Sequence, residues 1–203
     1  MHIPDGFLNA PTLGAGLVVS GTVLAHSIQR VNRTISESEI PTMGLLAAVI
    51  FSVQLFSIPV VGGTSTHLNG ALLAALLLGP RKAFIVMCAA LLALALIFQH
   101  GGLLSIGINV VNIALIGTFG GYALVRLLGR NPVSILLTAW FTAALAASLC
   151  ALELAGSGML TLKEGLLPLL SVHSITGILE GIITWFALSF IERVRPQLLE
   201  HLG

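Results

Sequence analysis

The chain has 203 residues, of which 56% are hydrophobic and only 8% charged, and its net charge is +1. Its mean hydropathy is +1.03. Soluble domains typically carry about 25% charged residues, so this composition excludes an ordinary soluble domain and predicts an integral membrane protein. The small net charge gives no electrostatic basis for binding nucleic acid.

The apolar runs predict seven transmembrane helices, because a spanning helix needs about 20 mostly apolar residues. The runs lie at 12–29, 42–60, 66–79, 83–98, 105–128, 133–153 and 166–191. No basic segment with a cleavage site precedes the first run, so no cleaved signal peptide is expected. The sequence therefore predicts an all-α bundle forming one transmembrane domain, 1–203. The short run 66–79, which ends at the helix-breaking Gly79-Pro80, is its least regular span.

The basic residues are placed asymmetrically along these runs. Eight of the nine follow odd-numbered runs, namely Arg30, Arg33, Arg81, Lys82, Arg126, Arg130, Arg193 and Arg195. Lys and Arg concentrate in cytoplasmic loops, which predicts an outer amino terminus (1–11) and a cytoplasmic carboxyl terminus. The same pattern favours a crossing by 66–79, because otherwise Arg81 and Lys82 would face outward.

The chain opens with Met1 and His2, which together can chelate a metal. The α-amino group of Met1, the backbone nitrogen of His2 and a ring nitrogen of His2 close a five-membered and a six-membered ring around one ion. Three nitrogens in a plane suit Ni(II) or Cu(II) and leave one in-plane position open. The turn-forming Pro4-Asp5-Gly6 can direct this terminus back into the protein. The alternative is that His2 is an accident of the chain start.

A second histidine lies in the polar link between the second and third runs. Gly62 and Gly63 permit a sharp loop, and Thr64 or Ser65 is predicted to cap the third helix. His67 would then lie in the first turn of that helix and supply the fourth nitrogen. The alternative is a loop histidine bonded to a nearby carbonyl group.

The last run carries His173 and Glu180 on one helical face. A carboxylate within the membrane is costly and is a functional candidate by default. We expect Glu180 to bond to Asn109 or Asn112 of the fifth run, or to Gln54 of the second. Such a network can gate the site or simply hold helices together, and direct metal ligation is a further alternative.

Other polar residues are candidates to orient the metal ligands from behind. These are Asp5, Gln54, Asn69 and His100. The chain has no Walker A, Gly-x-Ser-x-Gly or His-Glu-x-x-His motif, so we expect no ATP hydrolysis and no enzyme activity from it. An intramembrane metal-dependent enzyme built on His173 and Glu180 is the distant alternative. A metal sensor would need a signalling domain, for which the short ends leave no room.

These motifs together resemble one family. The motifs that carry the resemblance are the opening Met-His-Ile-Pro-Asp-Gly-Phe-Leu, the loop from Gly62 to His67, Leu77-Leu78-Gly79-Pro80, the Asn109/Asn112 pair and the segment Gly177–Gly181. The chain resembles the substrate-capture (S) subunit of nickel/cobalt energy-coupling-factor (ECF) transporters, the CbiM/NikM family. The resemblance covers essentially the whole chain. It implies a seven-helix bundle and metal ligation by Met1, His2 and His67.

The resemblance also implies partners and a cargo. The expected partners are a transmembrane coupling (T) subunit, two cytoplasmic ATPase subunits and a small accessory membrane subunit, all in the cell membrane of a prokaryote. The Ile-Pro-Asp-Gly form is more similar to the nickel branch, with Ni(II) as cargo. Cobalt uptake for cobalamin synthesis through the same site stays open, because the same plane can hold Co(II).

Overall fold

The computed structural model describes residues 2–56, 58–60 and 64–202. Six helical stretches in this part of the chain are long and apolar enough to cross a membrane. They are α1 (Ala10–Val31), η1 with α2 (Glu37–Glu39 and Ile40–Leu55), α4 (Pro80–Phe98), the joined α5, η2 and α6 (Ile106–Asn109, Val110–Gly120 and Gly121–Leu128), α7 (Pro132–Gly156) and α8 (Leu162–Val194). The shorter elements are β1 (Ile58–Val60), β2 (Thr64–Thr66), α3 (Ala71–Leu78) and η3 (Pro196–Leu202).

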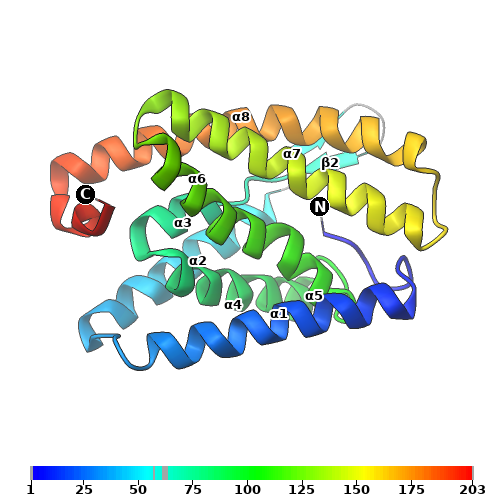
Figure 1. The fold of residues 1–203 in the computed structure, drawn as a ribbon, viewed down its shortest axis with the longest axis horizontal. Helices are drawn as coiled ribbons and strands as arrows, with labels where there is room; N and C mark the ends of the chain where they lie inside the picture. The colour runs from blue at the N-terminus through cyan, green and yellow to red at the C-terminus, as the bar shows by residue number, and fades with distance from the viewer. Residues whose placement is uncertain (1, 57, 61–63, 203) are drawn as a thin grey trace.

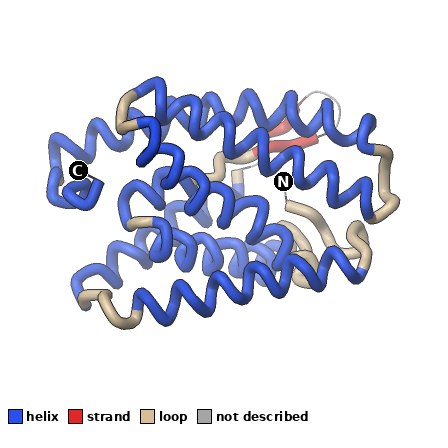
Figure 2. The backbone as a smooth tube through the Cα atoms, viewed as in Figure 1, coloured by secondary structure: helices blue, strands red, loops and turns tan. Residues whose placement is uncertain are grey.

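The long helices lie roughly side by side along the length of the molecule (Figure 1). The tube in Figure 2 is almost wholly helical apart from one short hairpin, in which Ile58 pairs with Thr66. Helices α7 and α8 pack backbone to backbone: a Cβ atom added at Gly177 would lie 2.9 Å from the Cα atom of Trp140, and one at Gly181 would lie 2.8 Å from that of Leu136. Small residues four apart therefore allow this close approach.

The run 66–79 is not a full-length helix, so the count of seven helical spans is not confirmed. Its helix, α3, has eight residues and is about 12 Å long at 1.5 Å per residue. Residues 67–70 before it are not helical, and Gly70 has a left-handed backbone with φ of 77°. The prediction that His67 occupies the first turn of a helix capped by Thr64 or Ser65 is therefore wrong, since both cap candidates belong to β2.

Two other runs differ from their predicted form. Helix α2 ends at Leu55 rather than continuing to residue 60, because Pro59 has no N–H to donate and the residue before a proline avoids the helical region. The run 105–128 is one continuous helix, but its middle part, Val110–Gly120, has the wide turns of a π-helix. Such turns are rare and are frequently found at functional sites.

The ends of the odd-numbered runs gather at one end of the bundle, where two ion pairs tie helices together. Lys82, at the start of α4, pairs with Glu39 at the start of α2. Arg130, after α6, pairs with Glu192 near the end of α8. The eight basic residues that follow odd-numbered runs therefore lie toward one end of the molecule, while Lys163 lies at the start of α8, at the other end. The membrane side that each end faces stays a prediction.

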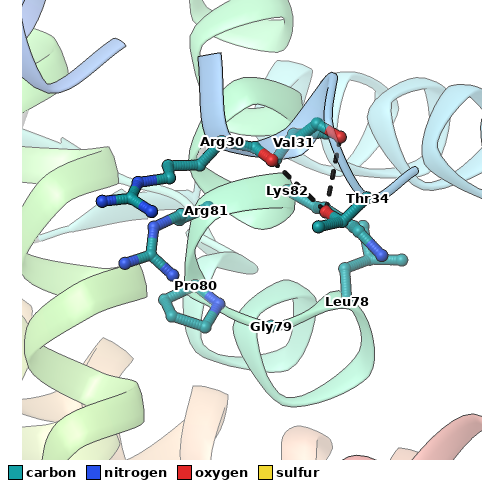
Figure 3. Close-up of a pocket in the computed structure, with 8 residues that line it drawn as sticks. All are labelled: Arg30, Val31, Thr34, Leu78, Gly79, Pro80, Arg81 and Lys82. Carbon is teal, nitrogen blue, oxygen red and sulfur yellow. Dashed lines mark hydrogen bonds between the residues drawn. The ribbon is translucent and has the colours of Figure 1, made fainter. Parts of the chain in front are cut away.

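A cleft at this end lies between the last turn of α1 and the turn that joins α3 to α4 (Figure 3). Arg30 and Arg81 extend along the same side of it. The hydroxyl of Thr34 donates to the carbonyl oxygens of Arg30 and Val31, which closes the end of α1. Segment 64–78 starts in the hairpin, where Thr66 of β2 bonds to Thr176 of α8, and it ends at this cleft, which Leu78 lines.

Candidate metal centre

Three histidines from distant parts of the sequence meet at the end of the bundle opposite the basic residues. The ring centroids of His2 and His67 are 4.6 Å apart, and those of His2 and His100 are 4.4 Å apart. One ring nitrogen from each of the three can be chosen so that all lie within 4.8 Å of one another. The predicted pair of His2 and His67 is therefore joined by His100, while Met1 lies outside the described residues.

An N-terminal strap, Ile3–Asn9, holds His2 in this cluster. The Oδ1 atom of Asn109 accepts the backbone N–H of Ile3 at 2.8 Å, and its Nδ2 atom donates to the carbonyl oxygen of Ile3 at 3.0 Å. The Ser105 hydroxyl and the Gly102 N–H donate to the same carbonyl oxygen. The backbone N–H and carbonyl groups of Ile3 are thus both satisfied, by Asn109 of the helix that starts at Ile106 and by Gly102 and Ser105 just before it.

Asp5 joins the strap to the loop that carries His100. Its carboxylate accepts the backbone N–H groups of Leu103, Leu104 and Ser105 at 2.8–3.1 Å. These are N–H groups at a helix start, which favours a negative charge. Asp5 therefore bonds to the backbone of this loop and is not a member of the histidine cluster.

At its other end the strap is fixed to α7. Asn9 caps α1 by accepting the N–H of Thr12, and it also donates from its side chain to the carbonyl oxygen of Gly156 at 3.0 Å. Its backbone N–H reaches the hydroxyl of Ser157. The strap is consequently held at both ends, at Ile3 and at Asn9, and His2 directly precedes the end at Ile3.

The loop segment 67–70 is held by Glu180 of α8. The two carboxylate oxygens accept the backbone N–H groups of Asn69 at 3.1 Å and Gly70 at 2.9 Å. This differs from the predicted partners of Glu180, because the carboxylate bonds to none of the side chains of Asn109, Asn112 and Gln54. Both of its oxygens act on the backbone that follows His67.

Two further contacts complete the support of this loop. Gln54 donates from Nε2 to the carbonyl oxygen of Asn69 at 2.8 Å. The side chain of Asn69 donates to the carbonyl oxygen of Ile113 at 3.2 Å, in the π-helical part of the central helix. Since Asn109 of the same helix holds the strap, this helix positions the segments of both His2 and His67.

The protonation states of the three imidazole rings leave nitrogen lone pairs free to bind a metal ion. Nδ1 of His67 lies 3.1 Å from the carbonyl oxygen of Leu68, which only accepts, so Nδ1 carries the hydrogen and Nε2 carries the free lone pair. Burial lowers the pKa of His67 to about 3. Burial, reinforced by the neighbouring His67, lowers the pKa of His2, and burial lowers that of His100. All three rings are therefore uncharged near neutral pH.

One nitrogen of the cluster stands out. Nε2 of His2 is buried and has no hydrogen-bond partner among the described residues. An unpaired buried polar atom costs about 1–3 kcal/mol, so a water molecule or an ion is expected to satisfy it. This nitrogen is distinct from Nδ1 of the same ring, which is the atom that can close a six-membered chelate ring with the backbone nitrogen of His2.

Two of the predicted candidates lie behind the histidine cluster. His173 shares a small internal cavity with His67 and Glu180, and its Nδ1 donates to the carbonyl oxygen of Leu169. Asn112 donates to Glu153 of α7 at 2.6 Å, so it bonds to neither histidine segment. Neither residue is a member of the cluster that brings His2, His67 and His100 together.

Sequence reasoning missed several contributors. Ser105 and the pair Gly101-Gly102 were not selected, although two glycines directly after a histidine indicate a close backbone approach. Glu153 was counted within an apolar run, where an acidic residue is itself a signal. The hydroxyl of Thr66 bonds to that of Thr176 at 2.8 Å across β2 and α8, and no local pattern identifies such a pair.

Gly102→Ala is expected to disrupt the centre. A Cβ atom there would lie 1.9 Å from Oδ1 and 2.4 Å from the backbone nitrogen of Asp5, so the strap must shift and His2 must shift with it. We expect at least about a tenfold loss of nickel affinity, as for loss of a group that orients a metal ligand, measured by calorimetric titration. Gly14→Ala is the matched control, because nothing lies near its added Cβ. Equal affinities for the two variants would contradict the role of the strap.

One protein family matches nearly the whole chain. Residues 2–198 match the family model CbiM, described as the cobalt uptake substrate-specific transmembrane region. The chain is 34% identical to a putative fused nickel transport protein NikMN of Archaeoglobus fulgidus, over 99% of this chain and 68% of that protein. It is 31% identical to the cobalt transport protein CbiM of Sorangium cellulosum, over 100% of this chain and 96% of that protein.

A solved structure is similar over nearly the whole length. The crystal structure of a transition metal transporter superposes with a TM-score of 0.88 at 30% identity, covering 96% of this chain and 93% of that one. The relatives are metal transport proteins rather than enzymes. With six apolar helices, they indicate a multi-pass membrane protein of a prokaryote. The resemblance inferred from the sequence motifs is thus confirmed: the chain belongs to the CbiM family and is a substrate-specific transmembrane component for uptake of cobalt or nickel.

Proposed function

We propose that this chain captures Ni(II), or Co(II) at the same site, at the outer membrane face as the substrate-binding subunit of an ATP-driven ECF-type importer. The observation that carries the proposal is the convergence of His2, His67 and His100 beside the chain start. The amino group of Met1, the backbone and ring nitrogens of His2 and Nε2 of His67 would give four nitrogens in one plane. That geometry suits Ni(II).

The hydrogen bonds that hold the backbone beside the two histidines support this assignment. Asn109 and Asp5 fix the strap that bears His2, and Glu180 fixes the backbone that follows His67. Ligands held in this way are pre-organised, so little ordering remains to be done when the ion arrives. The basic residues at the opposite end of the bundle support an outward orientation of the site.

The proposal includes partners for the transport step. This sequence carries no ATP-binding motif, so energy would come from two separate ATPase subunits and a transmembrane coupling subunit, with an accessory membrane subunit as a further partner. Sustained concentrative uptake of nickel into vesicles that contain this chain alone would contradict the requirement for ATPases.

Nickel affinity is expected to fall as the pH is lowered, which tests the chelate. The α-amine, with an ordinary pKa of about 8, and the backbone nitrogen of His2 must each lose a proton to bind. The pKa of His67 is about 3, so that ring is neutral throughout and adds no step near its ordinary value of about 6.5. Nickel titrations from about pH 8.5 to pH 5 measure the slope. An affinity that does not change with pH would exclude the amine as a ligand.

A further inference from the structure

The cleft between the end of α1 and the start of α4 carries two arginines whose charges no described acid balances. Arg30 lies in the last turn of α1 and Arg81 in the first turn of α4, and both extend along the same side of the cleft (Figure 3). Neither arginine forms an ion pair with a described acidic residue. The cleft has a volume of about 330 Å³ and is therefore a positively charged space at one end of the bundle.

The backbone around this cleft also favours an anion. The first turn of α4 contains no acidic residue, and no described side chain caps it. The N–H groups of Arg81 and Lys82 therefore have no partner within the helix, and such groups attract negative charge. The carbonyl oxygens of Arg30 and Val31 would repel an anion, but the hydroxyl of Thr34 already donates to both of them.

An apolar groove with a volume of about 380 Å³ lies between the same two helices. On α1 it is lined by Leu17, Gly21 and Ile28. Their spacing in the sequence places them on one helical face, and the next position on that face is Val31, which lines the cleft. The groove on α1 therefore leads toward the cleft.

The α4 side of the groove has the same relation to the cleft. Ile85, Cys88 and Leu92 line it, and their spacing places them on the helical face that begins with Arg81. Leu92 is 45% exposed and Leu17, across the groove, is 61% exposed, so the groove is open to the surroundings of the bundle. Among the described residues that line it, none is charged.

The dimensions of cleft and groove match a lipid in one leaflet. Helix α1 has 22 residues, and its length of about 33 Å is close to the ~30 Å of a hydrocarbon core. Arg30 then lies at the level of the lipid phosphate groups. From Ile28 to Leu17 the groove follows the helix for about 16 Å, and half of a hydrocarbon core is about 15 Å deep.

We propose that an anionic phospholipid binds here, with its phosphate group at Arg30 and Arg81 and one acyl chain in the groove between α1 and α4. Basic pockets between transmembrane helices bind anionic headgroups in this way. An apolar helix of a partner would leave the arginines without a counter-charge, and inorganic phosphate would leave the groove empty. The site lies at the opposite end of the bundle from the histidine cluster, and its occupancy does not require the proposed metal capture.

Native mass spectrometry of the purified chain in a mild detergent counts bound lipids. The probes are phosphatidylglycerol and phosphatidylcholine with the same acyl chains, titrated separately, and we expect one tightly bound phosphatidylglycerol and little phosphatidylcholine. The double variant Arg30→Gln, Arg81→Gln should weaken phosphatidylglycerol binding about 25-fold, since each basic side chain near an anionic lipid contributes about fivefold in affinity. The matched control is Arg193→Gln with Arg195→Gln, which removes the same charge from two exposed residues outside the cleft.

Gly21→Leu tests the groove separately. A Cβ atom added at Gly21 meets no atom within 4 Å, so a leucine side chain fits there and takes the space of the acyl chain. We expect phosphatidylglycerol binding to weaken at least about threefold, because the chain loses its packing contacts. Gly14→Leu is the matched control, since Gly14 belongs to the same helix, does not line the groove and has equally open space around an added Cβ atom.

Circular dichroism and gel filtration verify that each variant is folded. Equal binding of the two lipids to the unmodified chain would overturn the proposal, and so would equal effects of the two arginine pairs. Unchanged phosphatidylglycerol binding in Gly21→Leu would overturn the place given to the acyl chain and leave a site for the phosphate group alone. If the double variant at the cleft does not fold, the comparison of the two lipids on the unmodified chain decides the role of charge.

Discussion

Adding one residue ahead of Met1 is expected to abolish the dependence of nickel binding on His67. At the proposed site, the terminus of the native protein would supply three nitrogens, so the ring of His67 would be needed to complete the plane. In the extended protein the histidine becomes the third residue. The new amine, two backbone nitrogens and the ring of that histidine then form a complete four-nitrogen chelate. The two forms therefore differ in what His67→Ala does.

The experiment crosses the two termini with His67→Ala. In the native form we expect His67→Ala to weaken nickel binding by more than about a hundredfold, beyond the usual effect of an outer-shell partner. In the extended form the same substitution should have little effect. Calorimetric titration with Ni(II) and Co(II) measures the effect of His67→Ala in each form, and mass spectrometry verifies that Met1 is retained. An equal loss in both forms would show that His67 acts somewhere other than the open in-plane position.

Glu180→Ala is expected to lower both stability and nickel affinity. The substitution leaves the N–H groups of Asn69 and Gly70 without acceptors, and an unpaired buried donor costs about 1–3 kcal/mol. Removing the buried carboxylate also relieves its own desolvation, which offsets part of this loss. The segment that bears His67 loses its attachment to α8, so the affinity should fall with the thermal midpoint. Glu180→Gln keeps one acceptor oxygen and should be intermediate.

A double-mutant cycle separates positioning from a general loss of stability. If Glu180 acts through His67, then Glu180→Ala should weaken nickel binding far less in a His67→Ala background than in the native one. Glu192→Ala is the control, because it removes a more exposed carboxylate of the same helix, one that pairs with Arg130. Additive effects of Glu180→Ala and His67→Ala on affinity would show that Glu180 does not affect nickel binding by positioning His67 through the 67–70 loop.

The helices were largely predictable because their signal is local. Six of the seven predicted apolar runs correspond to helical stretches long enough to span a membrane, namely α1, α2 with η1, α4, α7, α8 and the helix that begins at Ile106. The failure at 66–79 has a local cause as well. The composition shows that this segment is apolar, but the left-handed backbone of Gly70 and the bonds to Glu180 keep residues 67–70 out of the helix. The apolar residues of this segment determine that it is buried, whereas its hydrogen-bond partners determine its backbone conformation.

The candidate site also has a part that local sequence predicts and a part that it does not. The chemistry of Met1 and His2 is local, since neighbouring atoms alone close the chelate rings, and His67 followed from a distinctive loop. The place of His100 did not follow from its surroundings in the sequence. It was selected only as an orienting residue, and its approach to His2 requires Gly101 and the turn at Gln99.

What the sequence alone determined is therefore the membrane character, most of the helices, the family and two of the clustered histidines. The tertiary structure decided how they are held. Asn109 reaches Ile3 across 106 residues, and Glu180 reaches Gly70 across 110. Periodicity and spacing describe a residue's own helix, whereas these contacts depend on which helices pack together and at what depth. That choice is made by the summed burial and close packing of the whole bundle, and no single segment of the sequence contains it.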